Sequence, residues 1–239
     1  MTGSILNAAG ILMGGALGLV MRRHFSASTQ LALRGAIFVL TVIIGLHLTW
    51  AGLNGTFLQI FKQVVILLLA LTAGRVAGRG MRLQRMLNRL GKYAGDRLEK
   101  ARQGTAHNFN DGFAVCALLF CAGPLGPIGA VEDGLMGYWQ PLAIKMAMDG
   151  LATMGFVNIF GWGAMLSALP VFVIEGTVTQ AAQALEPMMR AHGLLDSVNA
   201  VGGILVFCVA LIILELKKVE LADYLPSLAM APLITWLWH

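Results

Sequence analysis

Charged side chains are scarce in this chain: Asp, Glu, Lys and Arg make up 12% of its 239 residues. Soluble domains carry about 25% charged residues. The hydrophobic share is 57% and the mean hydropathy is +0.75. This balance excludes a soluble globular enzyme with one apolar helix and indicates an integral membrane protein.

Cysteine is also rare, with three residues, Cys116, Cys121 and Cys208, each in an apolar stretch. An odd number at membrane depth argues against a disulfide framework. No Cys/His pair has zinc spacing, and the sequence lacks the H-E-x-x-H, G-x-S-x-G and phosphate-loop patterns. We therefore expect no metal site, no cofactor and no enzymatic activity.

Apolar runs of about 20 residues, long enough to cross a bilayer, recur along the chain. The clear candidates are 4–21, 33–53, 58–76, 112–131, 162–184 and 197–216, with a shorter run at 224–238. The region 141–184 is either one long helix or two spans joined at Asn158–Gly161. The expected fold class is all-α: a single transmembrane helix bundle with seven or eight crossings.

Basic residues decide between these alternatives, because Lys and Arg flanking a span mark its cytoplasmic side. They form three groups: Arg22, Arg23 and Arg34; nine residues from Arg75 to Arg102; and Lys217 with Lys218. Two crossings within 141–184 place all three groups inside, whereas one crossing leaves the lysine pair outside. We therefore expect eight crossings with both termini outside, although a re-entrant pair near Gly161 satisfies the same parity.

The fourth span contains two prolines and three glycines between Gly123 and Gly129. Each proline removes a backbone donor and clashes with the preceding turn, so regular helix cannot continue there. Broken backbone at membrane depth survives where protein or a water-filled cavity satisfies it, and transporters build midplane sites from such helices. The alternative is a kinked helix that serves packing alone.

We expect one transmembrane domain, 1–239, that consists of four parts. These are the first three spans at 1–76, a basic amphipathic segment at 77–110, a central pair at 111–160 and the last three spans at 161–239. Asn7-Ala-Ala-Gly10 resembles Asn158-Ile-Phe-Gly161, and Gly35–Val39 resembles Gly202–Val206. These matches suggest an inverted repeat, in which the first and last three spans run in opposite senses.

Four acidic residues, Asp111, Asp133, Asp149 and Glu175, are each followed directly by glycine. A carboxylate at the bilayer centre costs about 2.5–3.5 kcal/mol on insertion scales, so such residues usually face a polar interior. Glu175 lies near the middle of its span and is the strongest candidate for an ion or substrate contact. The alternative is a protonated carboxyl with a structural hydrogen bond.

The other acids have simpler alternatives. Asp149 follows Lys145 by one helical turn, which fits an i,i+4 pair near the outer interface with Lys145 reaching outward. Asp133 lies in a glycine- and aromatic-rich stretch, read as an outer mouth or a solvated turn. Asp111 would cap the start of the fourth span.

Neutral groups complete the candidate site. The amides of Asn7 and Asn158 both donate and accept hydrogen bonds, and the hydroxyls of Thr177 and Thr179 are expected to supplement Glu175. Gly123 and Gly126 allow close approach at the break. Asn199, which follows Ser197, is read as a helix cap at the start of its span.

Two further patterns concern surfaces. Gly10 forms a G-x-x-x-G pattern with Gly14, and Gly14 forms another with Gly18, which favours close helix packing and leads us to expect a homodimer. Basic residues at three- and four-residue steps fall on one helix face and suit anionic lipid rather than nucleic acid. They are Arg75, Arg79, Arg82, Arg85, Arg89 and Lys92.

Several short motifs are spread over nearly the whole chain: Ser4–Ala8, Asp111–Phe113, Glu132–Gly134, Met148–Gly150, Ser167–Pro170, Glu175-Gly176, Ala200–Ile204 and Ala231–Leu233. In these motifs the chain resembles the YqgA-like bacterial inner-membrane proteins (DUF554), a family of unknown function. The resemblance implies an inner-membrane location and a glutamine at the position of Glu175, from which this chain departs. It implies no activity.

The function that these features predict is a membrane carrier or channel for a small ion or polar solute. Its site would lie beside the broken helix, with Glu175 and Asp149 as charged contacts. The main alternative is a non-transporting structural, assembly or lipid-organising protein attached through the basic segment.

Overall fold

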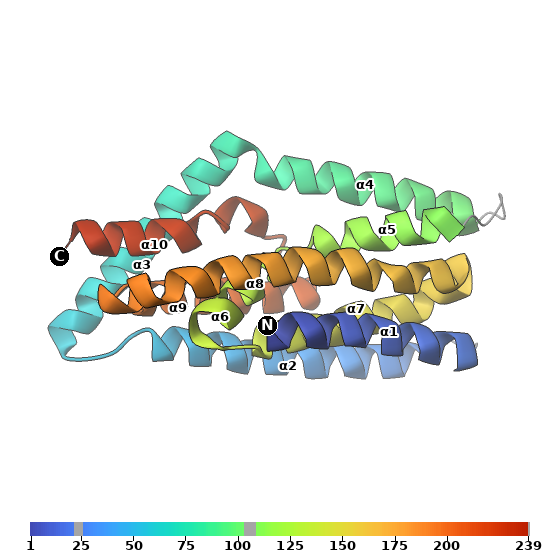
Figure 1. Cartoon of the computed structure of the whole chain (residues 1–239), viewed down its shortest axis with the longest axis horizontal. Helices are drawn as coiled ribbons and strands as arrows, with labels where there is room; N and C mark the ends of the chain where they lie inside the picture. Colours follow the sequence, from blue (N-terminus) through green and yellow to red (C-terminus); the bar gives the residue numbers. More distant parts are fainter. Residues whose placement is uncertain (22–25, 103–108, 239) are drawn as a thin grey trace.

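The computed structural model describes residues 1–21, 26–102 and 109–238, and these residues are helical with short connections (Figure 1). The α-helices are α1 (Thr2–Met21), α2 (Ala27–Ala51), α3 (Phe57–Met81), α4 (Leu83–Arg102), α5 (Phe109–Cys121), α6 (Leu125–Met136), α7 (Gln140–Phe160), α8 (Ala168–Ala191), α9 (Leu195–Ile213) and α10 (Ser227–Leu237). Two 3-10 helices, η1 (Gly161–Ser167) and η2 (Leu221–Tyr224), connect neighbouring helices. The all-α prediction is confirmed.

Within the described residues, five helical segments are long and apolar enough to cross a membrane, or up to six if the bent pair α5 and α6 forms one span. They include α1, most of α2, α3 and α9. The long run 140–191 is one of the five segments, and α10 with η2 is a shorter apolar helix. The chain therefore has the composition and helices of a multi-pass membrane protein.

The run 140–191 doubles back on itself. One straight helix would separate residues 145 and 175 by roughly 45 Å, at 1.5 Å per residue. Instead, Nζ of Lys145 lies 3.4 Å from Oε1 of Glu175. The reversal begins at Gly161, whose positive φ of 70° suits glycine, and it continues through η1 into α8.

The predicted break in the fourth span is confirmed. α5 ends at Cys121, α6 starts at Leu125, and the two axes differ by 60°. Pro124 precedes the first residue of α6 and Pro127 lies in its first turn, where a missing backbone donor costs little. The prolines thus begin a new helix rather than kink an existing one.

The basic segment differs from its prediction as one continuous helix face. α3 continues to Met81, and Arg82 then takes a left-handed conformation with φ of 58°. Arg75 and Arg79 therefore belong to α3, whereas Arg85 belongs to α4, which leaves in a new direction (Figure 1). The reason is local: Arg82 ends α3, and its backbone N–H bonds the carbonyls of Gly78 and Arg79.

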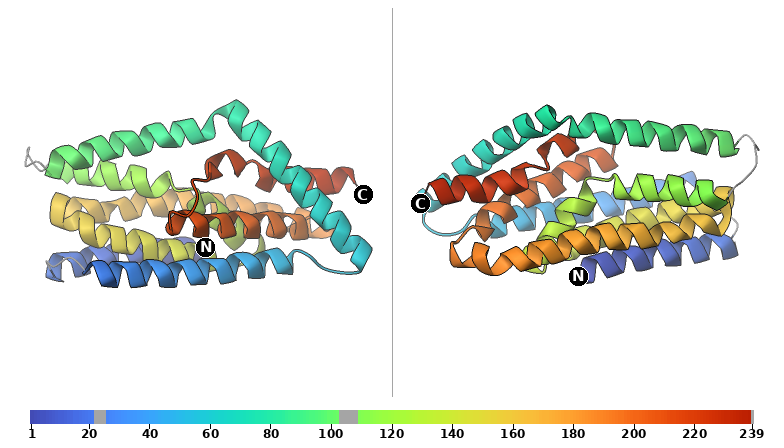
Figure 2. Two further views of the ribbon diagram at one scale, coloured as in Figure 1. Left: turned by 180° about the vertical axis from the view of Figure 1, so that it is seen from behind. Right: turned by 45° about the horizontal axis from the view of Figure 1, so that its top comes forward.

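α4 keeps part of its predicted amphipathic character. Its later residues Ala94 and Ala101 are buried in a cluster with Val115 and Phe160 of the bundle. Met86, by contrast, remains exposed. Figure 2 shows α4 along the outside of the bundle beside α5.

Glycines set the closest helix contacts. A Cβ at Gly14 would meet the backbone carbonyl of Gly150, and one at Gly18 would lie against Val157 and the backbone of Met154, so α1 packs directly on α7. The predicted packing role of this glycine pattern is confirmed, but the face is used within the chain. The predicted homodimer therefore gains no support from it.

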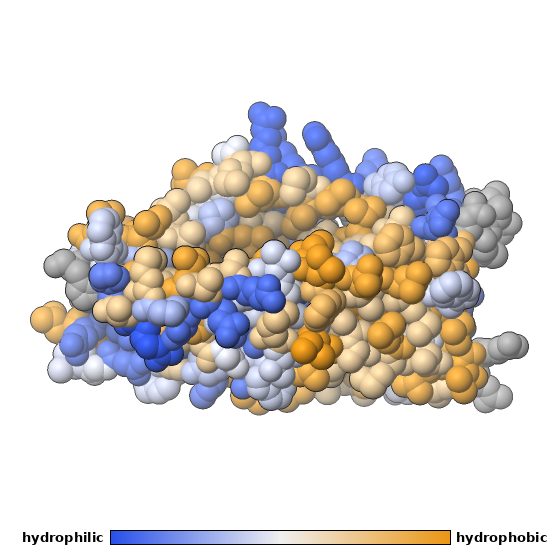
Figure 3. Space-filling view, viewed as in Figure 1, coloured by the Kyte–Doolittle hydropathy of each residue, from blue (hydrophilic) through white to orange (hydrophobic). Residues whose placement is uncertain are grey.

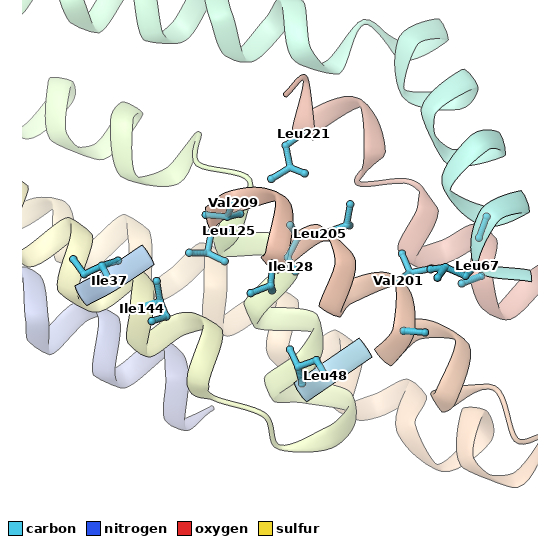
Figure 4. Packing of buried hydrophobic residues seen from close by; sticks show 14 residues of the cluster. Ile37, Leu48, Leu67, Leu125, Ile128, Ile144, Val201, Leu205, Val209 and Leu221 are labelled. Carbon is cyan, nitrogen blue, oxygen red and sulfur yellow. The ribbon is translucent and has the colours of Figure 1, made fainter. Parts of the chain in front are cut away.

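The largest apolar cluster joins α6 to α9 and to α2, α3 and α7 (Figure 4). Leu125 and Ile128 of α6 lie among Leu205 and Val209 of α9. The exterior also carries many apolar side chains, as expected for surfaces that face lipid. Figure 3 shows them over much of one half of the molecule, with hydrophilic residues toward the other end and over α4.

Candidate buried charge site

Four polar side chains from three helices meet in the interior of the bundle. Asn7 comes from α1, Lys145 and Asp149 from α7, and Glu175 from α8. The amide Nδ2 of Asn7 donates to both oxygens of Glu175, at 2.9 and 3.1 Å, and to Oδ2 of Asp149 at 3.3 Å. Lys145 binds Asp149 and also approaches Glu175. We call these four residues the charge cluster.

Helix geometry explains why these side chains meet. Lys145 and Asp149 are four residues apart and thus share one face of α7. The glycines of α1 allow that helix to approach α7 closely enough for Asn7 to reach both acids. The reversal at η1 then folds α8 back and brings Glu175 to the same point.

The broken helix lies along one side of the charge cluster. A Cβ at Gly126 would lie 3.2 Å from Oε1 of Glu175 and 3.3 Å from Cε of Lys145. At Gly123 it would lie 3.9 Å from Cε of Lys145. Both predicted glycines therefore lie beside the cluster, and a side chain at Gly126 would approach its charged groups more closely than one at Gly123.

The charge cluster is enclosed by protein. Asn7 is fully buried, and the exposed fractions are 3% for Lys145, 8% for Asp149 and 4% for Glu175. With every group ionised, its formal charge is −1, from one ammonium and two carboxylates. Oδ1 of Asn7 is buried and has no hydrogen-bond partner among the described residues. The cluster thus offers unused acceptor capacity and an unbalanced negative charge.

The sequence did not predict the role of Lys145 in the charge cluster. Its i,i+4 partner was predicted correctly, but the side chain was expected to reach outward to the interface. It points inward because the reversal at η1 supplies a second carboxylate, Glu175, which no local pattern reveals.

Asp133 is also placed differently from the prediction of an outer loop or solvated turn. It lies on α6 with an exposed fraction of 6%. Its Oδ2 accepts the backbone N–H of Gly3 at 3.0 Å and lies 3.0 Å from the amino group of Met1. A carboxylate stabilises the N-terminus of a helix, so Asp133 anchors α1 rather than joining the charge cluster.

Asn158 and Thr177 lie apart from the charge cluster. Nδ2 of Asn158 donates to the carbonyl of Met154 at 3.1 Å, near the end of α7. The hydroxyl of Thr177 donates to the carbonyl of Val173 at 2.6 Å on an exposed face of α8. The buried threonine is Thr179, whose Oγ1 lies 3.2 Å from Oγ of Ser4.

Asp111 and Asn199 were both predicted as helix caps, and the structure places them differently. Asp111 lies in the first turn of α5 and forms an ion pair of 2.9 Å with Arg97 of α4, which joins the basic segment to the bundle. Asn199 is a buried residue inside α9 rather than a cap, because α9 begins earlier, at Leu195. The basic residues Arg22 and Arg23 lie outside the described residues.

Glu132 is a buried acid that the sequence reading passed over. It lies on α6 with an exposed fraction of 0%. The spacing of Leu125, Ile128 and Glu132 puts all three on one helix face, which is the signal that could have revealed it.

Two cavities lie elsewhere in the molecule. One, of about 520 Å³, is lined by α2, α7 and residues near the end of α9, with Arg34 and Glu215 among them. The other, of about 840 Å³, is an apolar groove between α6, α8 and α10. Neither is lined by the charge cluster, and the described residues contain no group of three or more His, Cys, Asp or Glu placed to hold a metal.

Residues 2–236 match the family described as "Protein of unknown function (DUF554)". The chain belongs to the DUF554 family. The resemblance stated from the sequence is therefore confirmed over nearly its whole length.

Two relatives extend this comparison. The chain is 26% identical over 239 residues to the "Uncharacterized membrane protein YdfK" of Bacillus subtilis (strain 168), with 100% of this chain and 97% of YdfK covered. It is 24% identical over 237 residues to the "Uncharacterized protein YqgA" of Escherichia coli (strain K12), with 99% and 97% covered. No solved structure matches the chain.

Proposed function

We propose that this DUF554 protein is a membrane carrier or channel for a small ion or polar solute, and that the charge cluster is its binding site. The observation that carries the proposal is the convergence of Asn7, Lys145, Asp149 and Glu175 from three helices inside an apolar bundle. Ionisable side chains within membrane segments are costly, and they commonly mark ion or substrate pathways.

The charges of the cluster favour a cation or a cationic solute. One ammonium compensates one of the two carboxylates, so a formal charge of −1 remains. An isolated buried charge is strongly unfavourable unless it is paired. A bound cation or a proton would neutralise the cluster, and the free Oδ1 of Asn7 would add a neutral oxygen ligand.

The broken helix supports a route for exchange. Gly126, in the first turn of α6, lies beside the charged groups, and α6 is a short helix that follows a bend of 60°. Transporters commonly place their sites at discontinuous helices. A rotation of α6 would change access to Glu175 and Lys145 without unfolding either of the helices that carry them.

The eight-crossing topology is part of the proposal. The reversal at η1 supports two crossings within 140–191. In Figure 1 the turn between α7 and α8 lies at the same end as the end of α1 and the end of α4. These ends adjoin basic segments, which we place in the cytoplasm. With eight crossings, both termini then lie outside.

An inverted repeat also remains a proposal. α1 contacts α8, α2 packs on α9 and α3 packs on α10, as expected if the first and last three helices are related across one axis. The match between Asn7 and Asn158 does not fit this pairing, because Asn158 lies on α7 and not at the start of α8.

We further propose that the protein lies in a bacterial inner membrane, that the basic residues of α3 and α4 contact anionic lipid, and that two copies form a homodimer. Exposed Arg85 and Arg89 on α4 support the lipid contact. Two of the predicted lipid contacts have partners within the chain: Arg79 pairs with Glu220 at 3.2 Å, and Arg75 lies over the Tyr224 ring. The same basic surface favours the alternative function, a lipid-organising protein.

Flux into proteoliposomes tests the proposal. Purified protein is reconstituted, and uptake of a panel of monovalent cations, cationic solutes and neutral polar solutes is compared with protein-free vesicles. We expect uptake of at least one cation or cationic solute above the protein-free level. An absence of uptake across the panel, with correctly folded protein in the vesicles, would contradict transport and favour the lipid-organising alternative.

A further inference from the structure

Glu132 is a buried carboxyl that the charge cluster does not use. Its side chain is fully buried, and neither Oε1 nor Oε2 has a hydrogen-bond partner among the described residues. No described residue forms an ion pair with Glu132. A carboxylate in this situation would be an uncompensated buried charge, which proteins avoid.

The position of Glu132 is otherwise apolar. Leu125 and Ile128 precede it on the same face of α6, and both are buried in the cluster shared with α9 (Figure 4). A leucine would fit this pattern, so the carboxyl interrupts a face that packing alone would make hydrophobic.

The facing surface of α9 is shaped around the carboxyl. A Cβ at Gly202 would collide with Oε1 of Glu132, so any larger residue at that position would force the carboxyl group to move. Three residues earlier on α9, Oδ1 of Asn199 is buried and also lacks a partner among the described residues. The contact between α6 and α9 therefore holds unpaired acceptor oxygens from both helices.

We propose that Glu132 is a proton-binding site that locks α6 against α9. With a proton on one oxygen, the carboxyl is neutral and can donate a hydrogen bond, and Oδ1 of Asn199 is an unpaired acceptor on the facing helix. A hard metal cation would need about six or more oxygen ligands, whereas a proton needs one. Release of the proton to water leaves a carboxylate, which reaches solvent only when α6 separates from α9.

The other charged groups on α6 and on the helices packed against it do not pair with Glu132. They are Asp133, Lys145, Asp149, Glu175, Glu186, Arg190 and Asp196. The charge cluster accounts for three of them, Arg190 pairs with Glu186, and Asp133 faces Met1 and Gly3. Asp196 lies roughly two helical turns from Gly202 along α9. No described residue thus supplies Glu132 with a counter-ion.

Infrared difference spectroscopy tests the proton directly. Spectra of purified wild-type protein and Glu132→Gln are compared at neutral pH in lipid nanodiscs, with Glu215→Gln as control, because Glu215 is an exposed acid. We expect the carbonyl stretch of a protonated carboxyl in the wild type, its loss in Glu132→Gln and its retention in Glu215→Gln. The amide mimics the neutral acid, so Glu132→Gln should melt at or above the wild-type Tm.

The contrary result is equally clear. Loss of a carboxylate stretch in Glu132→Gln, with no loss of a carbonyl stretch, would show an ionised Glu132 and overturn the proposal. Glu132→Asp serves if Glu132→Gln does not fold: the carbonyl band should then shift in frequency, and an unshifted band would assign it to another residue. The measurement needs no transport assay, so its failure is distinct from failure of the proposed function.

Discussion

At the residue scale, Lys145 holds the charge cluster together. It binds Asp149 and lies 3.4 Å from Glu175, while Asn7 of α1 donates to both acids. Removal of the lysine leaves two buried carboxylates with one neutral donor between them. Breaking a buried pair in this way is far more harmful than replacing the whole pair.

We therefore expect Lys145→Met to lower the free energy of unfolding by about 3–5 kcal/mol. Glu175→Gln in the same background should restore part of this loss, because one uncompensated charge is removed. Denaturant titration of the two single variants and the double variant in detergent measures the coupling. Additive effects of the two substitutions would show that Lys145 and Glu175 do not interact.

Sequence reasoning found three of the four cluster residues, Asn7, Asp149 and Glu175, because polar groups stand out in apolar runs. It could not find the inward direction of Lys145, since that depends on a chain reversal between residues far apart in sequence. For a related reason, the sequence placed Asp133 wrongly in a loop and gave no role to Glu132. Their glycine-rich surroundings look like a loop, but Gly134 packs against the backbone of Thr179 within a helix contact.

At the element scale, the close contact between α1 and α7 depends on glycine. Gly14 faces the carbonyl of Gly150, whereas Gly35 of α2 has no atom within 4 Å of an added Cβ. The sequence predicted this packing from glycine spacing alone. It did not predict the partner helix, because glycine spacing carries no information about what it contacts.

The two glycines provide a matched pair of substitutions. Gly14→Ala should lower the free energy of unfolding by about 1–3 kcal/mol through overpacking. Gly35→Ala should raise it by up to about 1 kcal/mol, because alanine favours helix at an open position. Unfolding titrations of both variants check the difference in sign. Equal effects would show that α1 and α7 are not in close contact.

At the scale of the whole molecule, the reversal at η1 supports the topology that we propose. The sequence predicted a chain break near Gly161 from the distribution of basic residues, and it left open whether 141–184 forms two full spans or a re-entrant pair. The structure supplies the contact between Lys145 and Glu175 that a single straight helix cannot make. The membrane sides follow from charge and not from the helices themselves.

Cysteine labelling tests the membrane sides. In a background without Cys116, Cys121 and Cys208, a cysteine at Gly161 should resist an impermeant thiol reagent added to intact cells and should react after permeabilisation. A cysteine at Gly193, between α8 and α9, should react in intact cells. Reaction of both positions from outside would contradict two crossings in this region.

The central claim is that the charge cluster binds what crosses the membrane. The most direct measurement is the initial rate of uptake into proteoliposomes for the best solute of the panel. We expect Glu175→Gln and Asp149→Asn to reduce this rate about tenfold or more, equivalent to about 1.4 kcal/mol. The exposed control Glu215→Gln should match the wild type. Wild-type rates in both cluster variants would show that the charge cluster is structural and that the transport site lies elsewhere.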